Sequence, residues 1–295
     1  MGGGFYSLAS RSTRATSSGY YTKSANEIFS HSMKESMNPK NAKLRESRDS
    51  TDNPKSLAII VALDLTGSMG HIPHDLVKDG LPTMVDTMLQ KKVVSPQILF
   101  LGIGDHECDR APLQVGQFET SDELMDKWLT DIWIEFGGGG NTGESYLLAW
   151  YFAAYHTATD CFEKRGQKGF LFTIGDEATL KTLPTHALDN IMGLGQYQNF
   201  TAEGLLKEAQ KKYNVFHIHV TETGAGRDER AQQSWKQLIG QNVIFVNDFK
   251  DIPITIADLV AKNNKTNHSE IIDGVSTKEE VKINSDTEQI EEEIL

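Results

Sequence analysis

A continuous apolar run, Leu57–Leu63, constrains the fold of this chain more than any other feature of its sequence. Every residue of the run, LAIIVAL, is aliphatic, whereas a strand with one face in water alternates apolar and polar residues. Such a run is typical of a parallel strand covered by helices on both faces. Ile98–Ile103 and Gly169–Ile174 are also mostly apolar, without regular alternation of apolar and polar residues. The sequence therefore predicts a parallel sheet that is buried on both sides.

Segments with strand and helix periodicity alternate along the rest of the chain. We expect further strands at Val215–Val220 and Val243–Val246, and a short edge strand at Leu113–Phe118. Apolar residues at helical spacing predict helices at Ile72–Leu89, Glu123–Trp133, Glu144–Thr159, Thr201–Tyr213, Asp228–Ile239 and Ile252–Ala261. This alternation indicates one α/β domain with a doubly wound, mostly parallel, Rossmann-like sheet and one short antiparallel edge strand.

Composition changes at both ends of the apolar-rich region. Residues 1–55 are rich in Ser, Gly, Asn, Lys and Arg, so we expect a flexible arm with at most a short amphipathic helix around Ser24–Met33. Residues 56–263 carry the domain pattern, and residues 264–295 form a polar, acidic tail that we expect to be disordered.

The composition also excludes several classes of function. No apolar run reaches the roughly 18 residues of a membrane-spanning helix, so we expect no membrane partner. The net charge of −12 would repel phosphate backbones, which counts against nucleic acid as a partner. The two cysteines, Cys108 and Cys161, lie far apart and form no CxxC pair, which favours a reducing, cytoplasmic location.

Oxygen-bearing side chains gather in loops that follow the predicted strands. The first strand ends in Asp64, with Thr66 and Ser68 at alternate positions after it, and a later strand ends just before Asp176. Because ligands of open α/β sheets bind at the carboxyl edge, we expect these side chains to meet there. Carboxylate and hydroxyl oxygens suit Mg²⁺, which takes six oxygen ligands and keeps some of its waters. An acidic group of another molecule can complete such a site.

The phrase DLTGSMG after LAIIVAL resembles the D-x-[ST]-x-S motif of von Willebrand factor A (vWA) domains, which opens their metal-ion-dependent adhesion site, or MIDAS. The resemblance extends over about Ser56 to Asn263, and longer phrases such as GIGDHECDRAPLQVGQF are similar to a group of bacterial and phage proteins with this domain. It implies Mg²⁺ or Mn²⁺ as the ion and a partner's carboxylate as the last ligand. Carried over, Asp64, Thr66 and Ser68 form the first element of the site and Asp176 the third.

The second element departs from the family pattern. That family usually has G-G-T-x-T-G, and the threonine that contacts the metal corresponds to Gly140 here. Thr142 is our preferred substitute because its hydroxyl is the nearest chemical match. Asn141 and Glu144 are alternatives and, with Asp105 and Glu177, are expected around the ligands, where such groups orient metal-bound waters.

These residues at the carboxyl edge of the sheet support three hypotheses about function. Our first hypothesis is a non-catalytic adaptor that recognises an Asp or Glu on a protein partner; domains of this kind often serve AAA+ ATPases and other multi-protein assemblies. The second is a metal-dependent hydrolase that uses Asp64, Asp176, His106 and Glu107. The third is a zinc site, because His and Cys side chains that zinc accepts follow the first two strands: His71, His74, His106 and Cys108.

Overall fold

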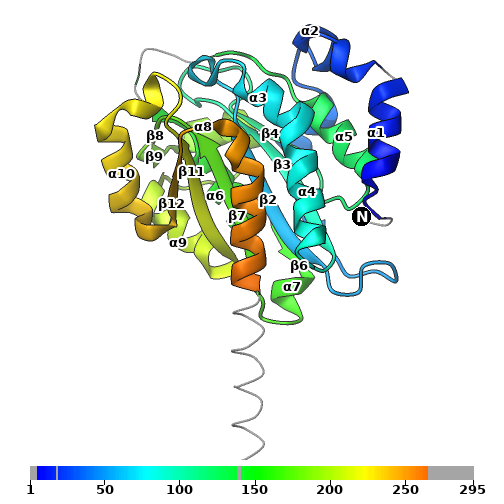
Figure 1. The fold of residues 1–295 in the computed structure, drawn as a ribbon. Coiled ribbons are helices and arrows are strands. Elements are labelled where there is room, and N and C mark those ends of the chain that lie inside the picture. Colours follow the sequence, from blue (N-terminus) through cyan, green and yellow to red (C-terminus); the bar gives the residue numbers. More distant parts are fainter. Residues whose placement is uncertain (1–4, 18, 138–140, 142, 265–295) are drawn as a thin grey trace, which may run out of the picture.

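A six-stranded sheet forms the centre of the computed structural model, which describes residues 5–17, 19–137, 141 and 143–264 (Figure 1). Its strand order is β12-β11-β7-β2-β3-β4. The bounds are β2 Leu57–Asp64, β3 Pro96–Ile103, β4 Leu113–Val115, β7 Gly169–Gly175, β11 Tyr213–Val220 and β12 Val243–Val246. All neighbouring pairs are parallel except β3 and β4, which are antiparallel. The predicted α/β class, with a mostly parallel sheet and one antiparallel edge strand, is confirmed.

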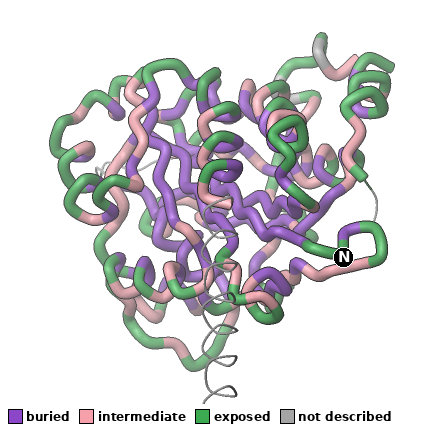
Figure 2. Tube along the Cα trace, turned by 60° about the horizontal axis from the view of Figure 1, so that its bottom comes forward, coloured by how far each residue is buried: buried purple, intermediate pink, exposed green. Residues whose placement is uncertain are grey.

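Helices cover both faces of this sheet and create two hydrophobic cores. Alternate residues of β2 enter different cores: Ile59, Val61 and Leu63 face one, and Ala58, Ile60 and Ala62 face the other. The first core is closed by α3 Ile72–Asp75, a π-helical turn Leu76–Gly80, α4 Leu81–Gln90, α5 Asp122–Asp131 and the helix over residues 252–264. The second is closed by α6 Leu147–Tyr155, α8 Thr185–Met192, α9 Ala202–Lys212 and α10 Glu229–Ile239. Figure 2 shows the sheet buried along most of its length.

Several helices differ from the sequence-based bounds. The expected helix at Glu144–Thr159 is shorter, because Gly143–Glu144 form a short strand (β5) and Thr157–Thr159 another (β6). The expected helix at Ile72–Leu89 is interrupted by the π-helical turn. Short elements not expected from the sequence are α7 Asp160–Glu163, β8 Ala178–Thr179, β9 Thr182–Leu183 and β10 Phe200–Thr201, with single 3-10 turns at Gly67–Met69, Ala225–Arg227, Gly240–Asn242 and Phe249–Asp251.

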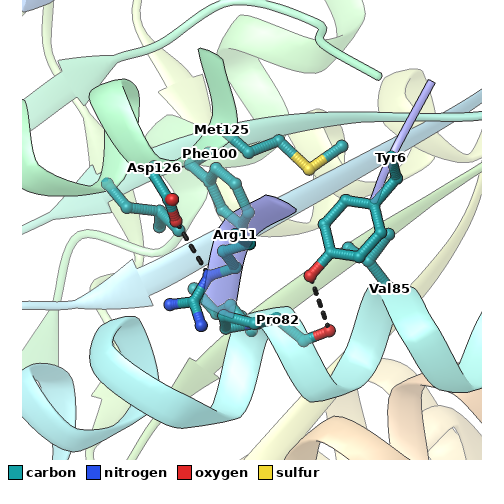
Figure 3. A pocket seen from close by; sticks show the side chains of 9 residues that line it. Tyr6, Arg11, Pro82, Val85, Phe100, Met125 and Asp126 are labelled. Atoms are coloured by element: carbon teal, nitrogen blue, oxygen red, sulfur yellow. Dashed lines mark hydrogen bonds and ion pairs between the residues drawn. The ribbon is translucent and has the colours of Figure 1, made fainter. Parts of the chain in front are cut away.

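The N-terminal segment is folded onto the domain, contrary to the expectation of a flexible arm. Helix α1 (Leu8–Ser17) lies beside α5, where Arg11 pairs with Asp126 at 3.0 Å and Arg14 with Asp122 at 2.8 Å. Figure 3 shows Tyr6 reaching α4, where its hydroxyl donates to the Pro82 carbonyl at 3.2 Å. The expectation was wrong for the described residues because Phe29, Met37 and Ala42 of this segment are buried in the two cores, and its arginines pair with a distant acidic helix.

The rest of this segment continues around the domain. It contains α2 Ala25–Ile28, shorter than the helix expected at Ser24–Met33, and 3-10 turns at Tyr20–Thr22, Glu35–Met37 and Pro39–Asn41. Strand β1 (Arg45–Ser47) then pairs in parallel with β6. The acidic tail expected at residues 264–295 lies outside the described residues beyond position 264. Within the described chain, no helix has the length and apolar character that crossing a membrane requires.

Candidate metal centre

Three aspartates stand at the carboxyl ends of three adjacent strands. Asp64 is the last residue of β2, Asp105 follows β3, and Asp176 follows β7. β2 is the strand from which the chain proceeds first to β3 and later back to β7, so strand order reverses here. This is the place where open α/β sheets bind ligands. All three aspartates are fully buried.

A chain of hydrogen bonds joins the first and third predicted elements of the site. The Asp64 Oδ1 atom accepts from the Thr66 amide at 2.9 Å and from the Thr66 hydroxyl at 2.6 Å. The Thr66 hydroxyl lies 3.2 Å from the Ser68 hydroxyl, which in turn donates to Asp176 Oδ1 at 2.8 Å. The structure therefore brings together four residues that are separated by up to 112 positions in the sequence, Asp64, Thr66, Ser68 and Asp176.

Two further side chains hold the outer oxygens of the same carboxylates. The Tyr146 hydroxyl donates to Asp64 Oδ2, and the Thr223 hydroxyl donates to Asp176 Oδ2 at 2.7 Å. Sequence reasoning missed both. Thr223 follows β11 and was accessible to the carboxyl-edge argument, but Tyr146 lies next to a helix and gave no such signal.

The metal-motif loop passes close to another backbone segment. The Gly67 amide donates to the Gly137 carbonyl at 2.7 Å, and a Cβ on Gly67 would lie 3.2 Å from that carbonyl oxygen. Glycine therefore permits the close approach that holds the loop against the segment before the glycine-rich stretch. Thr142, our preferred second-element ligand, lies outside the described residues, so its predicted role stays a prediction.

The residues expected around the ligands form a second polar group beside the first. The Asn141 amide donates to Asp105 Oδ2 at 2.6 Å and to Glu107 Oε2 at 3.1 Å. The His106 ring contacts the Ser145 hydroxyl at 2.7 Å. These contacts tie Asp105, His106 and Glu107 to the glycine-rich loop and its flank.

Glu144 and Glu177 lie on neighbouring segments, since Glu144 ends β5 and Glu177 directly precedes β8. Strand β5 pairs in parallel with β8, which brings Glu144 next to the loop that carries Asp176 and Glu177. Glu144 is 3% exposed and Glu177 is partly buried, and the Oε2 atom of each has no hydrogen-bond partner among the described residues.

Burial among like charges shifts the acidity of this region. Burial and the charge of Asp176 raise the pKa of Asp64 to about 7. Burial, together with the charges of Asp64, Glu177 and Asp105, raises the pKa of Glu144 to about 10, and burial beside Asp176 raises the pKa of Glu177. Both effects disfavour the ionised carboxylate, and a bound cation reverses them.

The zinc hypothesis finds no matching geometry. His71 and His74 lie beside Asp75, whereas His106 contacts Ser145, so the predicted His and Cys donors do not converge. Across the described part of the chain, no group of three or more His, Cys, Asp or Glu side chains is placed to hold a metal ion. The centre at β2 and β7 instead combines two carboxylates with two hydroxyls, a donor set that suits a hard cation.

Comparisons with known proteins concern the general fold. No protein-family model matches the sequence, and no curated protein matches it. Among solved structures, the pilus adhesin SpaC of Lactobacillus rhamnosus GG in its open conformation matches with a TM-score of 0.49 and 10% identity, over 74% of this chain and 31% of the adhesin.

Two further solved structures have lower scores. The vWF domain of the type V pili tip protein Mfa5 of Porphyromonas gingivalis gives a TM-score of 0.43 at 11% identity, over 71% of this chain and 95% of that domain. Proximal thread matrix protein 1 of the mussel byssus, with a zinc-occupied MIDAS motif, gives 0.41 at 12% identity, over 74% of this chain and 48% of that protein.

Proposed function

We propose that this chain is a vWA-type binding module that holds one divalent cation, Mg²⁺ or Mn²⁺, and uses it to capture an acidic side chain of a protein partner. The observation that carries the proposal is the chain of hydrogen bonds from Asp64 through Thr66 and Ser68 to Asp176. These hydrogen bonds bring four side-chain oxygens close together, so that one hard cation can bind all of them.

The donor set supports a cation whose coordination is completed from outside. Asp64, Thr66, Ser68 and Asp176 would hold the ion, supplying two carboxylates and two neutral hydroxyls. Mg²⁺ takes six oxygen ligands, so this set leaves positions for water and for a partner's carboxylate. The bound ion would supply positive charge that attracts and orients that carboxylate. Ser68 is partly exposed, whereas the two aspartates are buried, so the open side of the centre is at Ser68.

The contacts of His106 and Glu107 favour a binder over a hydrolase. Both lie in the loop after β3, but the hydrogen bonds described for them run to Ser145 and Asn141, not to Asp64 or Asp176. A general base must reach the proton that it abstracts, directly or through one water. As partner class we propose a protein that presents Asp or Glu, with an AAA+ ATPase or another multi-protein assembly as the first candidates.

The test is metal-dependent capture by the immobilised full chain. We expect a protein captured from a cell lysate in the presence of excess Mg²⁺ to be released by EDTA. The Asp64→Ala chain should not capture it. Asp258→Ala, an exposed aspartate on the helix over residues 252–264, is the matched control and should capture normally. Capture that survives both EDTA and Asp64→Ala would overturn the proposal. Metal-dependent turnover in parallel phosphatase and nuclease assays, lost in Asp64→Ala, would favour the hydrolase instead.

A further inference from the structure

A groove of about 410 Å³ lies between the π-helical turn Leu76–Gly80 and the segment that begins the helix over residues 252–264. This volume falls within the range of about 300–1,000 Å³ that is typical of ligand pockets. Figure 1 shows that helix (orange) beside α3 and α4, the elements that flank the π-helical turn. The residues that line the groove do not include Asp64, Thr66, Ser68 or Asp176.

A proline contributes to the π-helical turn that forms one wall. Pro82 has no amide hydrogen, so it cannot donate to the Lys78 carbonyl four residues earlier, as an α-helix requires. The Arg11 guanidinium donates to that carbonyl instead, at 2.8 Å. Gly80 permits close packing with the opposite wall, because a Cβ there would lie 3.1 Å from Pro253 Cγ. Single π-helical turns are rare and occur frequently at functional sites.

The groove combines an apolar floor with charges of opposite sign on its two walls. Leu76, Phe249 and Pro253 are buried and supply the floor. Asp79 is exposed on the wall of the π-helical turn, and Lys250 is exposed on the opposite wall. Within the part of the chain that the structure describes, neither the Asp79 carboxylate nor the Lys250 ammonium has an ion-pair or hydrogen-bond partner.

The wall that carries Asp79 offers only acceptors to a ligand. Asp75 adds a second carboxylate, whose Oδ1 lies 2.9 Å from His74 Nδ1 and whose Oδ2 lies 3.6 Å from His71 Nε2. The Thr83 hydroxyl donates to the Asp79 carbonyl at 2.8 Å, which leaves its oxygen lone pairs as acceptors. Two carboxylates and a hydroxyl oxygen on one wall suit a cationic donor group.

The apolar floor narrows the class of cation that the groove suits. A metal ion would make no use of apolar side chains, whereas an arginine side chain can pack its methylene groups on Leu76 and Pro253 while its head reaches the carboxylates. A guanidinium is also planar, carries donors in a fixed fork and is more weakly hydrated than an ammonium. Arginine therefore matches both the floor and the acidic wall.

The groove begins beside the open side of the metal centre. His71 follows Ser68 by three positions, and its ring meets the ring of Phe249 edge-on, with centroids 5.6 Å apart. Phe249 in turn lines the groove. A protein that places an acidic side chain at Ser68 can therefore extend across His71 into the groove.

We propose that this groove binds an arginine side chain of the protein partner, which then carries a basic residue close to the acidic residue that meets the metal. The identity of the partner rests on the proposed function, but the groove itself does not use the ion. Asp75 and Asp79 attract the guanidinium, whereas Lys250 opposes it. The two walls therefore predict opposite effects when their charges are removed.

The test titrates N-acetyl-arginine amide into the full-length chain and follows backbone amide shifts by NMR. A ligand of this size should bind with a Kd on the order of 1 mM. We expect saturable shifts at residues 75–83 and 249–253. N-acetyl-citrulline amide has nearly the same shape without the charge and should bind about tenfold more weakly, because it forms no charged hydrogen bonds to the carboxylates.

Three variants test the charges of the walls. Asp79→Asn should weaken binding of the arginine probe about two- to fivefold, the range expected for exposed ion pairs. Lys250→Ala should strengthen it by a similar factor, because a repelling charge is removed. Asp258→Asn changes an exposed aspartate outside the groove and should bind the probe as the wild type does. Loss of folding cannot produce opposite effects at two exposed positions.

The outcomes separate this inference from the proposed function. The probe should bind equally well in EDTA and to Asp64→Ala. Equal affinity for the citrulline probe, or no saturable shift at these residues, would overturn the arginine site and leave the metal centre untouched. If the partner uses the groove, excess arginine probe should release the protein that EDTA also releases, and the citrulline probe should not. A partner retained at saturating arginine probe would exclude the groove from capture.

Discussion

Gly175→Ala should destabilise the fold and disturb the metal centre through a single steric contact. Gly175 is the last residue of β7, directly before Asp176. A Cβ at this position would lie 1.9 Å from the Tyr146 hydroxyl oxygen and 2.5 Å from the ring carbon that bears it. The ring is fully buried and packs against His217 and Trp235, with ring centroids 5.2 and 5.5 Å away. It therefore has little room to retreat.

The expected cost has two parts. Overpacking of a closed core typically costs about 1–3 kcal/mol. Displacement of the Tyr146 hydroxyl also removes its hydrogen bond to Asp64, and bonds to charged groups are worth about 1.5–3 kcal/mol. Because relaxation shares the strain between the two, we expect a loss of about 3 kcal/mol in the free energy of unfolding. For a domain of this size, that loss lowers the thermal midpoint by roughly 6–12 °C.

Urea unfolding followed by circular dichroism measures this loss. Gly224→Ala is the control: a Cβ there meets nothing within 4 Å, so a change of less than about 0.5 kcal/mol is expected. Tyr146→Phe removes the hydroxyl oxygen that the new Cβ would meet first. Gly175→Ala should therefore lower the free energy of unfolding less in the Tyr146→Phe background, with a coupling energy on the order of 1 kcal/mol. A Gly175→Ala protein as stable as the wild type would refute the steric argument and the placement of Tyr146 against β7.

Three further predictions concern the N-terminal segment and the acidic groups. Arg14→Ala removes partly exposed ion pairs to Asp122 and Asp126, so it should loosen α1 at a cost of no more than about 1 kcal/mol in the free energy of unfolding. Amide hydrogen exchange at residues 8–17 should become faster, and unchanged exchange would count against the packing of α1 on α5. Burial raises the pKa of Asp160, but hydrogen bonds from Lys164, the Asp49 amide and Arg48 outweigh it and lower that pKa to about 2. Ionised Asp160 therefore stabilises the fold above the unfolded pKa near 4, and this stabilisation is lost as pH falls toward 2. Asp160→Asn should flatten the acid limb of the stability curve, and an unaltered limb would exclude this ion-pair cluster as its source. Burial beside Asp176 raises the pKa of Asp64, so the metal-free protein should lose stability as pH rises from about 4 toward 7, whereas Asp64→Asn should lose this slope; the same slope in both proteins would contradict the burial of an acid there.

The sequence predicted the central fold because strands buried on both faces have a distinctive pattern of continuous apolar residues. The runs at β2, β3 and β7 have no polar alternation, and the side chains of β2 enter both cores in turn. The carboxyl-edge rule then selected Asp64 and Asp176 from loops far apart in the chain, because parallel strands place their ends at one edge whatever the connections contain.

Features that depend on distant partners could not be predicted in this way. The order of α1 comes from Arg11 and Arg14 meeting acidic residues of α5 more than 100 positions away, and local composition carries no record of such pairs. The strand at Gly143–Glu144 exists only because it pairs with β8, so the apolar pattern that follows it suggested an earlier helix start. Tyr146 contacts Asp64 across the sheet edge and leaves no periodic signal.

A crystal structure of the full chain soaked in Mn²⁺ tests the central claim most directly, because anomalous scattering locates the ion independently of the protein coordinates. We predict one peak between the Asp64 and Asp176 carboxylates, in contact with the Ser68 hydroxyl at about 2.2 Å, close to the distances of hard divalent ions to oxygen. Asp64→Ala crystals should lack this peak. A peak elsewhere on the molecule, or a vacant carboxyl edge at saturating Mn²⁺ in the wild type, would contradict the account.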